Sequence, residues 1–246
     1  MKTAHIRFYE ELNDFLPPPQ RKQRFDIHFN GTPSIKDVIE SQGVPHTEID
    51  LILVNGTSVR FNYKLKNEDD VSVYPLFESF DISSLQRLRA KPLRHPKFVL
   101  DVHLGALAKY MRMLGFDTKY QNDFLDEQII EISLKEKRTA LTRDVGILKQ
   151  KKLTHGYYVR NTKPVKQIEE IIIRFDLKNE INEFSRCVRC NTILSSIEKE
   201  KVINEIPPKV RIAQSEFFYC SVCDKIYWKG THYEKMKVMI EKMKAL

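Results

Sequence analysis

The sequence predicts an α/β protein with three parts: a small mixed sheet, a parallel α/β domain, and a C-terminal region built around one zinc ion. Three observations support this prediction. Predicted strands and one helix follow the order ββαββ up to about residue 80, and strands then alternate with helices. The four cysteines, the only ones in the chain, form two CxxC pairs, which suits one tetrahedral zinc site.

The composition is that of a globular protein. The chain has 246 residues, of which 41% are hydrophobic and 30% are charged, so two or three domains are expected. Nothing approaches 18 consecutive apolar residues, and the N-terminus lacks the apolar core of a signal peptide. We therefore expect a cytoplasmic protein with no membrane partner.

The charge is unevenly distributed along the chain. The net charge of +8 divides into −3 for residues 1–80 and +11 for residues 81–246. The basic part is the candidate for a polyanionic partner, most simply RNA. The alternative is that the charge serves solubility alone.

The first part of the chain predicts a β-grasp domain over residues 1–81. A helix at 34–41 ends at Gly43, and Asn55-Gly56 is a hairpin signal. The predicted strands are 4–8, 25–29, 51–54 and 71–74. Residues 82–96, with four basic side chains and two prolines, are predicted to be a basic linker.

The second part, residues 97–180, predicts a mainly parallel sheet covered by helices. Leu104, Leu107, Ala108, Met111 and Leu114 recur at helical spacing before Gly115. The predicted strands are 98–100, 118–121, 139–141 and 157–159, and the other helices are 126–137 and 164–175.

Four aspartates lie at or near the carboxyl ends of these strands, where ligands bind in parallel sheets. Asp101 and Asp144 follow two strands directly, whereas Asp123 and Asp126 lie between a strand and a helix. Hard carboxylate oxygens favour Mg²⁺ or Mn²⁺, which activate water for phosphodiester hydrolysis. The alternative is that Asp126 caps a helix and Asp123 closes a turn.

The third part, residues 181–246, predicts a zinc ribbon with a C-terminal helix. The predicted ligands of a structural Zn²⁺ are Cys187, Cys190, Cys220 and Cys223. Two disulfides or two redox dithiols are the alternative. Because 29 residues separate the pairs, we expect an extra hairpin between them, and we expect Trp228 to pack in the core.

The chain resembles the Mut-seven C-terminal family, a PIN-like ribonuclease module with a zinc ribbon, preceded by a ubiquitin-like, sulfur-carrier-like domain. The N-terminal resemblance lies in Phe8–Leu16, Gly43–His46, Leu51–Gly56 and Val71–Pro75. The ribonuclease resemblance lies in Phe98–Asp101, Leu104–Asp117, Asn122–Glu127, Leu141–Leu148, Phe184–Asn191, Pro207-Pro208 and Cys220–Tyr233.

This resemblance implies a Mg²⁺- or Mn²⁺-dependent ribonuclease with Asp101, Asp144, Asp126 and Asp123 as catalytic candidates. Near the proposed site, Arg112, Arg143 and Lys109 are the candidate RNA phosphate ligands. The alternative function is a non-catalytic RNA-binding adaptor in which the zinc ribbon does the binding. The β-grasp domain is expected to bind a protein partner, since it lacks the terminal Gly-Gly that sulfur transfer requires.

Overall fold

The computed structural model describes residues 1–75 and 96–246. Met1–His95 together with Asp144–Tyr158 form one compact unit, and Pro96–Arg143 with Val159–Leu246 form the other. The predicted basic linker lies outside the described residues apart from Pro96. Among the described residues, none of the helices has the length and apolar character needed to cross a membrane.

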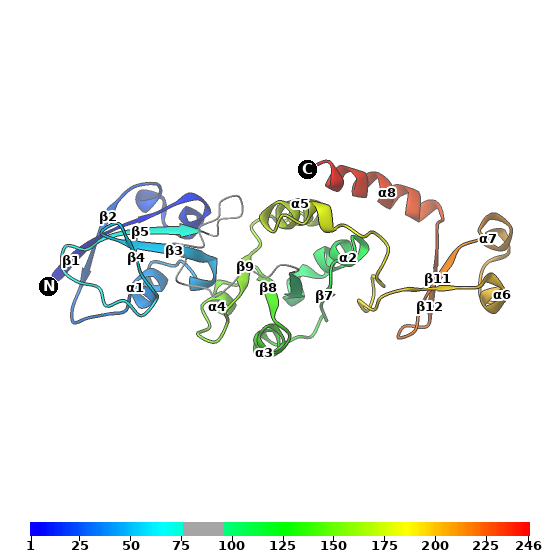
Figure 1. The fold of residues 1–246 in the computed structure, drawn as a ribbon, viewed down its shortest axis with the longest axis horizontal. Helices are drawn as coiled ribbons and strands as arrows, with labels where there is room; N and C mark the ends of the chain where they lie inside the picture. The colour runs from blue at the N-terminus through cyan, green and yellow to red at the C-terminus, as the bar shows by residue number, and fades with distance from the viewer. Residues whose placement is uncertain (76–95) are drawn as a thin grey trace. The chain divides into compact units, whose positions relative to one another are not determined.

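The N-terminal domain contains a five-stranded sheet in the order β2-β1-β5-β3-β4 (Figure 1). The first strand pairs parallel with β5 and antiparallel with β2, which is the β-grasp arrangement expected from the sequence. The elements are β1 (Lys2–Phe8), η1 (Glu10–Phe15), η2 (Pro18–Gln20), β2 (Phe25–Phe29), α1 (Ile35–Ser41), η3 (His46–Glu48), β3 (Ile49–Val54), β4 (Thr57–Ser58) and β5 (Asp70–Pro75).

Local sequence signals explain the boundaries of this domain. The Ser34 side chain accepts a hydrogen bond from the Asp37 amide and so caps α1. Gly43 follows the helix with φ of 101°, a conformation that favours glycine. Asn55 and Gly56 have φ of 49° and 78° between β3 and β4, which confirms the predicted two-residue hairpin turn.

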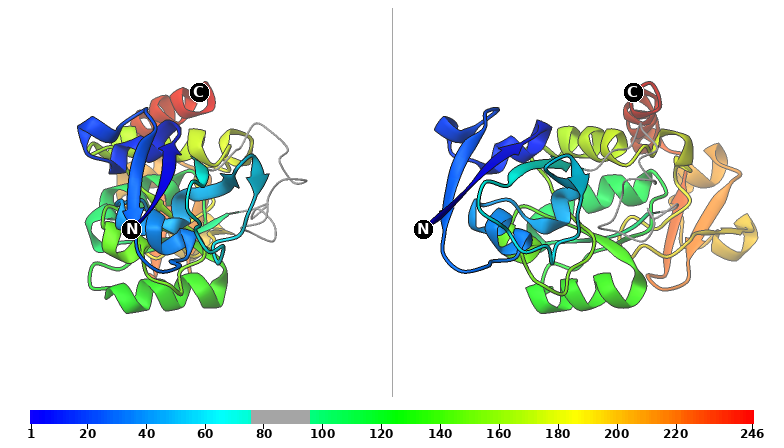
Figure 2. Two further views of the ribbon diagram at one scale, coloured as in Figure 1. Left: turned by 90° about the vertical axis from the view of Figure 1, so that its left-hand side faces the viewer. Right: turned by 60° about the vertical axis from the view of Figure 1, so that its left-hand side comes forward.

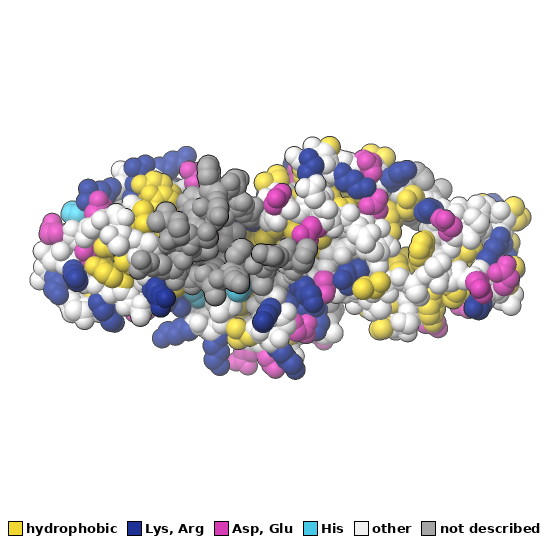
Figure 3. Space-filling view, viewed as in Figure 1, with side chains coloured by type: hydrophobic (Ala, Val, Ile, Leu, Met, Phe, Trp, Pro, Cys, Tyr) yellow, Lys and Arg dark blue, Asp and Glu magenta, His cyan; other side chains and the backbone are white. Residues whose placement is uncertain are grey.

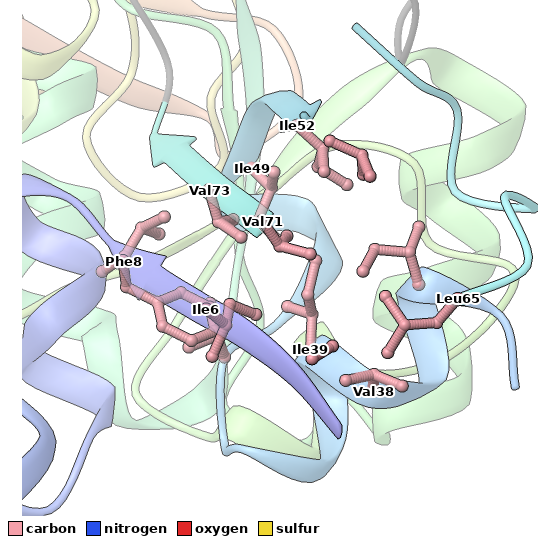
Figure 4. Close-up of a cluster of buried hydrophobic side chains, with 14 of the residues drawn as sticks. Ile6, Phe8, Val38, Ile39, Ile49, Ile52, Leu65, Val71 and Val73 are labelled. Carbon is pink, nitrogen blue, oxygen red and sulfur yellow. The ribbon is translucent and has the colours of Figure 1, made fainter. Parts of the chain in front are cut away.

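The core of this domain lies between α1 and the sheet. Figure 4 shows side chains from the helix and from three strands pointing toward one another. Alternation along β1 and β5 places every second residue on this face, and in β3 a register shift between Ile49 and Leu51 lets both Ile49 and Ile52 reach it, so strands and helix bury a common apolar surface. The labelled members are Ile6, Phe8, Val38, Ile39, Ile49, Ile52, Leu65, Val71 and Val73.

The central sheet has four strands in the order β7-β6-β8-β9. Its strand β6 pairs in parallel with both β7 and β8, which confirms the predicted parallel α/β domain. Helices α2 and α5 pack together on one face of the sheet, and α3 covers the other (Figures 1 and 2). The elements are β6 (Lys97–Leu100), η4 (Val102–Leu104), α2 (Gly105–Met113), β7 (Thr118–Lys119), α3 (Asp126–Glu136), β8 (Arg138–Thr142), α4 (Val145–Leu148), β9 (Gly156–Tyr158), α5 (Pro164–Arg174) and η5 (Lys178–Glu180).

The strand order creates a topological switch point between β6 and β8. From β6 the chain passes through α2 to β7 on one side, and it then passes through α3 to β8 on the other side. In open parallel sheets the crossovers diverge at such a point, which leaves a crevice beyond the carboxyl ends of the two strands. The carboxyl ends of β6 and β8 therefore mark the place to look for a functional site.

The zinc-ribbon region contains a three-stranded antiparallel sheet in the order β10-β11-β12. The prediction of an extra hairpin between the cysteine pairs is wrong, because two short helices, α6 and α7, follow β10 there. Val202 at the end of α6, Ile206 between the two helices and Val210 in α7 pack on Phe217. Trp228 packs on the same cluster, as predicted. The elements are β10 (Ser195–Ile197), α6 (Lys199–Val202), α7 (Pro208–Ala213), β11 (Phe217–Cys220), β12 (Lys225–Trp228) and α8 (Thr231–Lys244).

Candidate functional site

Asp101 lies directly beyond β6, at the switch point. Its backbone amide donates to the Leu141 carbonyl at 3.0 Å, which continues the parallel ladder by one residue. Its carboxylate accepts a hydrogen bond from the Thr142 hydroxyl at 2.7 Å, and its side chain is only 4% exposed. Because Thr142 is the last residue of β8, this bond fixes the Asp101 carboxylate beside the end of the neighbouring strand.

Asp144 follows the end of β8 by two residues and is exposed. Its Oδ1 accepts a hydrogen bond from the Gly146 amide at 2.6 Å, so it caps the four-residue helix α4. A side chain at position 146 would press on this oxygen, since a Cβ there would lie 2.9 Å from it. Capping uses one lone pair of a carboxylate that has about four, so it is compatible with metal ligation.

Asp123 and Asp126 are both exposed and lie between β7 and α3. Asp126 is the first residue of α3, and the N-cap position before it is occupied by Leu125. The Gln128 side chain accepts from the Leu125 amide at 2.8 Å, so the expected capping role of Asp126 is taken by its neighbours. Asp123 lies in a turn, as expected from the sequence.

The four aspartates differ from the four cysteines in how closely they are gathered. Among the His, Cys, Asp and Glu side chains that the structure describes, the cysteines form the group close enough to hold one ion. The aspartates do not form such a group in the described part of the chain. Two of them nevertheless leave the sheet at the same edge, because Asp101 follows β6 and Asp144 follows its parallel neighbour β8.

Arg112, predicted to bind RNA, is buried in the α2 face and only 3% exposed. Its guanidinium donates to four backbone carbonyls: those of Thr118 at 2.9 Å, Tyr120 at 3.2 Å, Val188 at 3.3 Å and Arg189 at 2.7 Å. Burial lowers the pKa of this guanidinium, although the nearby Cys190 and Cys187 act in the opposite direction. These bonds direct Arg112 to the protein backbone, and we therefore omit it from the proposed phosphate ligands.

The other two predicted phosphate ligands have different surroundings. Arg143 Nη1 donates to the carbonyls of Val159, Arg160 and Asn161, at 2.7, 2.7 and 2.8 Å, which ties the end of β8 to the start of the segment before α5. Lys109 is exposed on α2. His103 is also exposed, at the entry to α2.

The four cysteines form the predicted metal centre. Their sulfur atoms lie within 4.8 Å of one another, and Cys190 Sγ is 3.3 Å from Cys220 Sγ. Tetrahedral zinc with Zn–S bonds of about 2.3 Å would separate its sulfurs by roughly 3.8 Å, so the group fits this ion. The ligands would be Cys187, Cys190, Cys220 and Cys223.

The thiols are close enough to share protons. Burial opposes ionisation of Cys190, but hydrogen bonds from Thr192, Cys223 and Cys220 outweigh it and lower its pKa to about 6. The hydrogen bond that Cys223 makes to Cys190, together with burial, raises the pKa of Cys223 to about 12. A cation that displaces these protons would bind four thiolates, as zinc requires.

The first cysteine pair is joined to the central domain by a polar network. Asn191, in the left-handed conformation with φ of 74°, accepts from the Thr118 amide at 2.9 Å and donates to Asp117 at 2.7 Å. Arg138 of β8 donates to the same Asp117 oxygen at 2.7 Å. Burial would raise the pKa of Asp117, but hydrogen bonds from Arg138 and Asn191 and the charge of Arg186 hold it below its usual range.

Two residues beside the candidate site escaped the sequence analysis. Thr142 donates a hydrogen bond to Asp101. The register of the two strands could have indicated this contact, because Leu141 pairs with Leu100 and the next residues, Thr142 and Asp101, are therefore neighbours. Tyr120 donates to the Val102 carbonyl at 3.0 Å, over Gly105, where a Cβ would meet its hydroxyl at 2.5 Å. In the sequence, the contact of Tyr120 with the start of α2 is indicated only by the glycine at position 105.

The fold and the cysteine cluster define a protein with a ubiquitin-like domain followed by an α/β domain and four cysteines that could hold a metal ion. The chain belongs to the Mut7-C RNAse domain family, whose model matches residues 96–240. Residues 1–81 match the model for Mut7-C ubiquitin. Both matches confirm the family and the N-terminal domain expected from the sequence. No curated protein and no solved structure matches the chain.

Proposed function

We propose that this protein is a Mg²⁺- or Mn²⁺-dependent ribonuclease whose active site lies beyond the carboxyl ends of β6 and β8. Family membership supports ribonuclease activity. The observation that carries the proposed site is the placement of Asp101 and Asp144 after the two parallel strands that flank the switch point. Their oxygens are the hard donors that these cations prefer.

The residues have distinct proposed roles. Asp101, held by Thr142, and the exposed Asp144 would bind the cation, with Asp126 and then Asp123 as further ligands. When bound, the cation would lower the pKa of the attacking water and neutralise the leaving oxygen. Lys109 and Arg143 would contact RNA phosphates. Zinc held by the cysteines would stabilise the ribbon, which would assist RNA binding in the cytoplasm.

The test is cleavage of a labelled RNA with Mg²⁺ or Mn²⁺. Asp101→Asn and Asp144→Asn should each reduce the cleavage rate by at least about 100-fold, because each removes charge needed to bind and use the cation. EDTA should abolish cleavage. Asp176→Asn is the matched control, since Asp176 is exposed at φ of 48°, a conformation that asparagine tolerates. Full activity in both site variants would refute the proposed site.

One observation favours a second function, that of a non-catalytic RNA-binding adaptor. The aspartates of the described residues do not gather around one position, and Asp144 already caps α4. An adaptor would bind RNA without turnover, and Cys220→Ser with Cys223→Ser would abolish that binding. Measuring RNA binding and cleavage on the same samples distinguishes the two functions.

A further inference from the structure

We propose that the ubiquitin-like domain positions Asp144, by clasping the segment Asp144–Tyr158 with the three residues of η3. This inference rests on the proposed function, because it matters for catalysis only if Asp144 binds the cation. The segment lies within the sequence matched by the ribonuclease model, but it is compact with the N-terminal domain. The partner of the ubiquitin-like domain is thus part of the same chain.

The clasp begins with three consecutive polar residues that are buried. His46, Thr47 and Glu48 are 7%, 2% and 1% exposed. Burying polar side chains is unfavourable unless they form hydrogen bonds, so such a run requires partners. It therefore marks a contact surface of the domain.

All three side chains meet the backbone of the segment. His46 Nε2 lies 2.9 Å from the Leu153 carbonyl, and since a carbonyl only accepts, this nitrogen carries the proton. The Thr47 hydroxyl donates to the Leu148 carbonyl at 3.4 Å. The Tyr158 amide donates to Glu48 Oε1 at 2.6 Å. Recognition of backbone groups at three points specifies the path of the segment.

Two further contacts fix the clasp from both sides. Glu40 Oε1 lies 2.7 Å from His46 Nδ1 and orients the imidazole ring. In the other direction, Lys149 Nζ donates to the Glu40 carbonyl at 2.9 Å. This bond gives Lys149 a role in docking the segment.

Close packing within the segment and one aromatic contact with the N-terminal domain accompany these hydrogen bonds. Leu148 and Leu153 are fully buried, and Gly156 lies where a Cβ would be 2.6 Å from the first, 3.1 Å from the second and 3.5 Å from Thr47. The Tyr158 ring packs edge-on against Phe15 at 5.4 Å. A larger residue at position 156 would press first on Leu148 and Leu153 of the segment itself, so the glycine keeps the segment compact beside Thr47.

The position of Asp144 depends on this docking. Its carboxylate is bound to the Gly146 amide, in a helix of only four residues. Helices of that length are unstable alone in water, so α4 takes its conformation from what it packs on. The residues of η3 are therefore positioning residues for the proposed ligand.

The test compares Glu48→Ala with Glu48→Gln, and His46→Ala with His46→Gln, in the full chain. Glutamine at either position keeps a group that can make the bond to the segment. Each alanine variant should increase the hydrogen-exchange rate of the Gly146 and Tyr158 amides about tenfold, the effect of losing one buried hydrogen bond. It should lower kcat for RNA, leave KM unchanged, and raise the Mn²⁺ concentration needed for half-maximal rate. Glutamine at the same position should restore the wild-type exchange rate, kcat and Mn²⁺ requirement.

His28→Ala is the control, because His28 is exposed on β2 of the same domain.

If an alanine variant loses the circular dichroism of the folded protein, Lys149→Met tests the clasp from the side of the segment. Unchanged exchange of the segment amides in the folded variants would overturn the clasp. Faster exchange with unchanged kcat and Mn²⁺ requirement would overturn positioning. Wild-type cleavage by both Asp101→Asn and Asp144→Asn would refute the proposed site, whereas the exchange data would still decide the clasp.

Discussion

At the scale of residues, Arg112 illustrates how one side chain can join elements that are distant in sequence. Its guanidinium donates to the carbonyl of Thr118 in β7, to that of Tyr120 directly after β7, and to two carbonyls within the first CxxC pair. Arginine suits this position because its five N–H donors lie in one plane and point in different directions. The single ammonium group of lysine could reach only some of the four carbonyls. The residue thus stabilises the central domain and the cysteine turn together.

We predict that Arg112→Lys lowers the free energy of unfolding by about 2–4 kcal/mol, because several buried carbonyls lose their donor. Thermal or urea unfolding checks this. Lys109→Gln is the matched control, since Lys109 is exposed on the same helix, and it should leave stability unchanged. Equal stability of the Arg112 and Lys109 variants would contradict the structural role of Arg112.

At the scale of elements, the first cysteine pair belongs to the central domain as much as to the ribbon. Asn191 bridges Thr118 and Asp117, and the Phe184 amide donates to the Met113 carbonyl at 2.8 Å. Loss of the metal should therefore disturb β7 as well as the ribbon strands.

Removing zinc with a chelator, or replacing Cys220 with serine, should increase hydrogen exchange at Thr118 in β7 as well as in β11 and β12. The reason is that zinc stabilises the turn that holds Asn191 in place. The amides of β1 serve as the internal control and should keep their protection. If exchange increased only in the ribbon strands, the hydrogen bonds of Asn191 would not couple loss of zinc to β7.

Regular elements were predictable from the sequence, whereas contacts between them were not. The helical spacing of Leu104, Leu107 and Met111 specified α2, and the Asn55-Gly56 pair specified a turn. The buried role of Arg112 could not be predicted, because its four acceptors are backbone carbonyls that carry no sequence signal. Asp101 was predictable as a candidate from its place after a strand, but its bond to Thr142 depends on strand register.

At the scale of the whole molecule, charge bears on RNA binding. On the face shown in Figure 3, Lys and Arg side chains are scattered over the described surface and interspersed with Asp and Glu. On this face the basic side chains of the described residues are therefore not gathered into one patch. Such a distribution suits contacts with several phosphates along an RNA strand.

We predict that the affinity for a single-stranded RNA falls steeply between 50 and 200 mM salt, by roughly 0.7 log units per log unit of salt for each phosphate contacted. Lys109→Gln should reduce this slope by about one contact, and the Asp176→Asn variant should not. Fluorescence anisotropy over a salt series gives both slopes. Salt-independent binding would contradict phosphate recognition.

The discontinuous unit formed by Met1–His95 and Asp144–Tyr158 sets an order for biosynthesis. The ribosome completes the N-terminal sheet well before residue 144 emerges, so the docking surface is folded when its segment arrives. A fragment beginning at residue 96 would lack that surface, so the Leu148 and Leu153 carbonyls and the Tyr158 amide would lose their side-chain partners. The full chain is therefore the natural unit for purification.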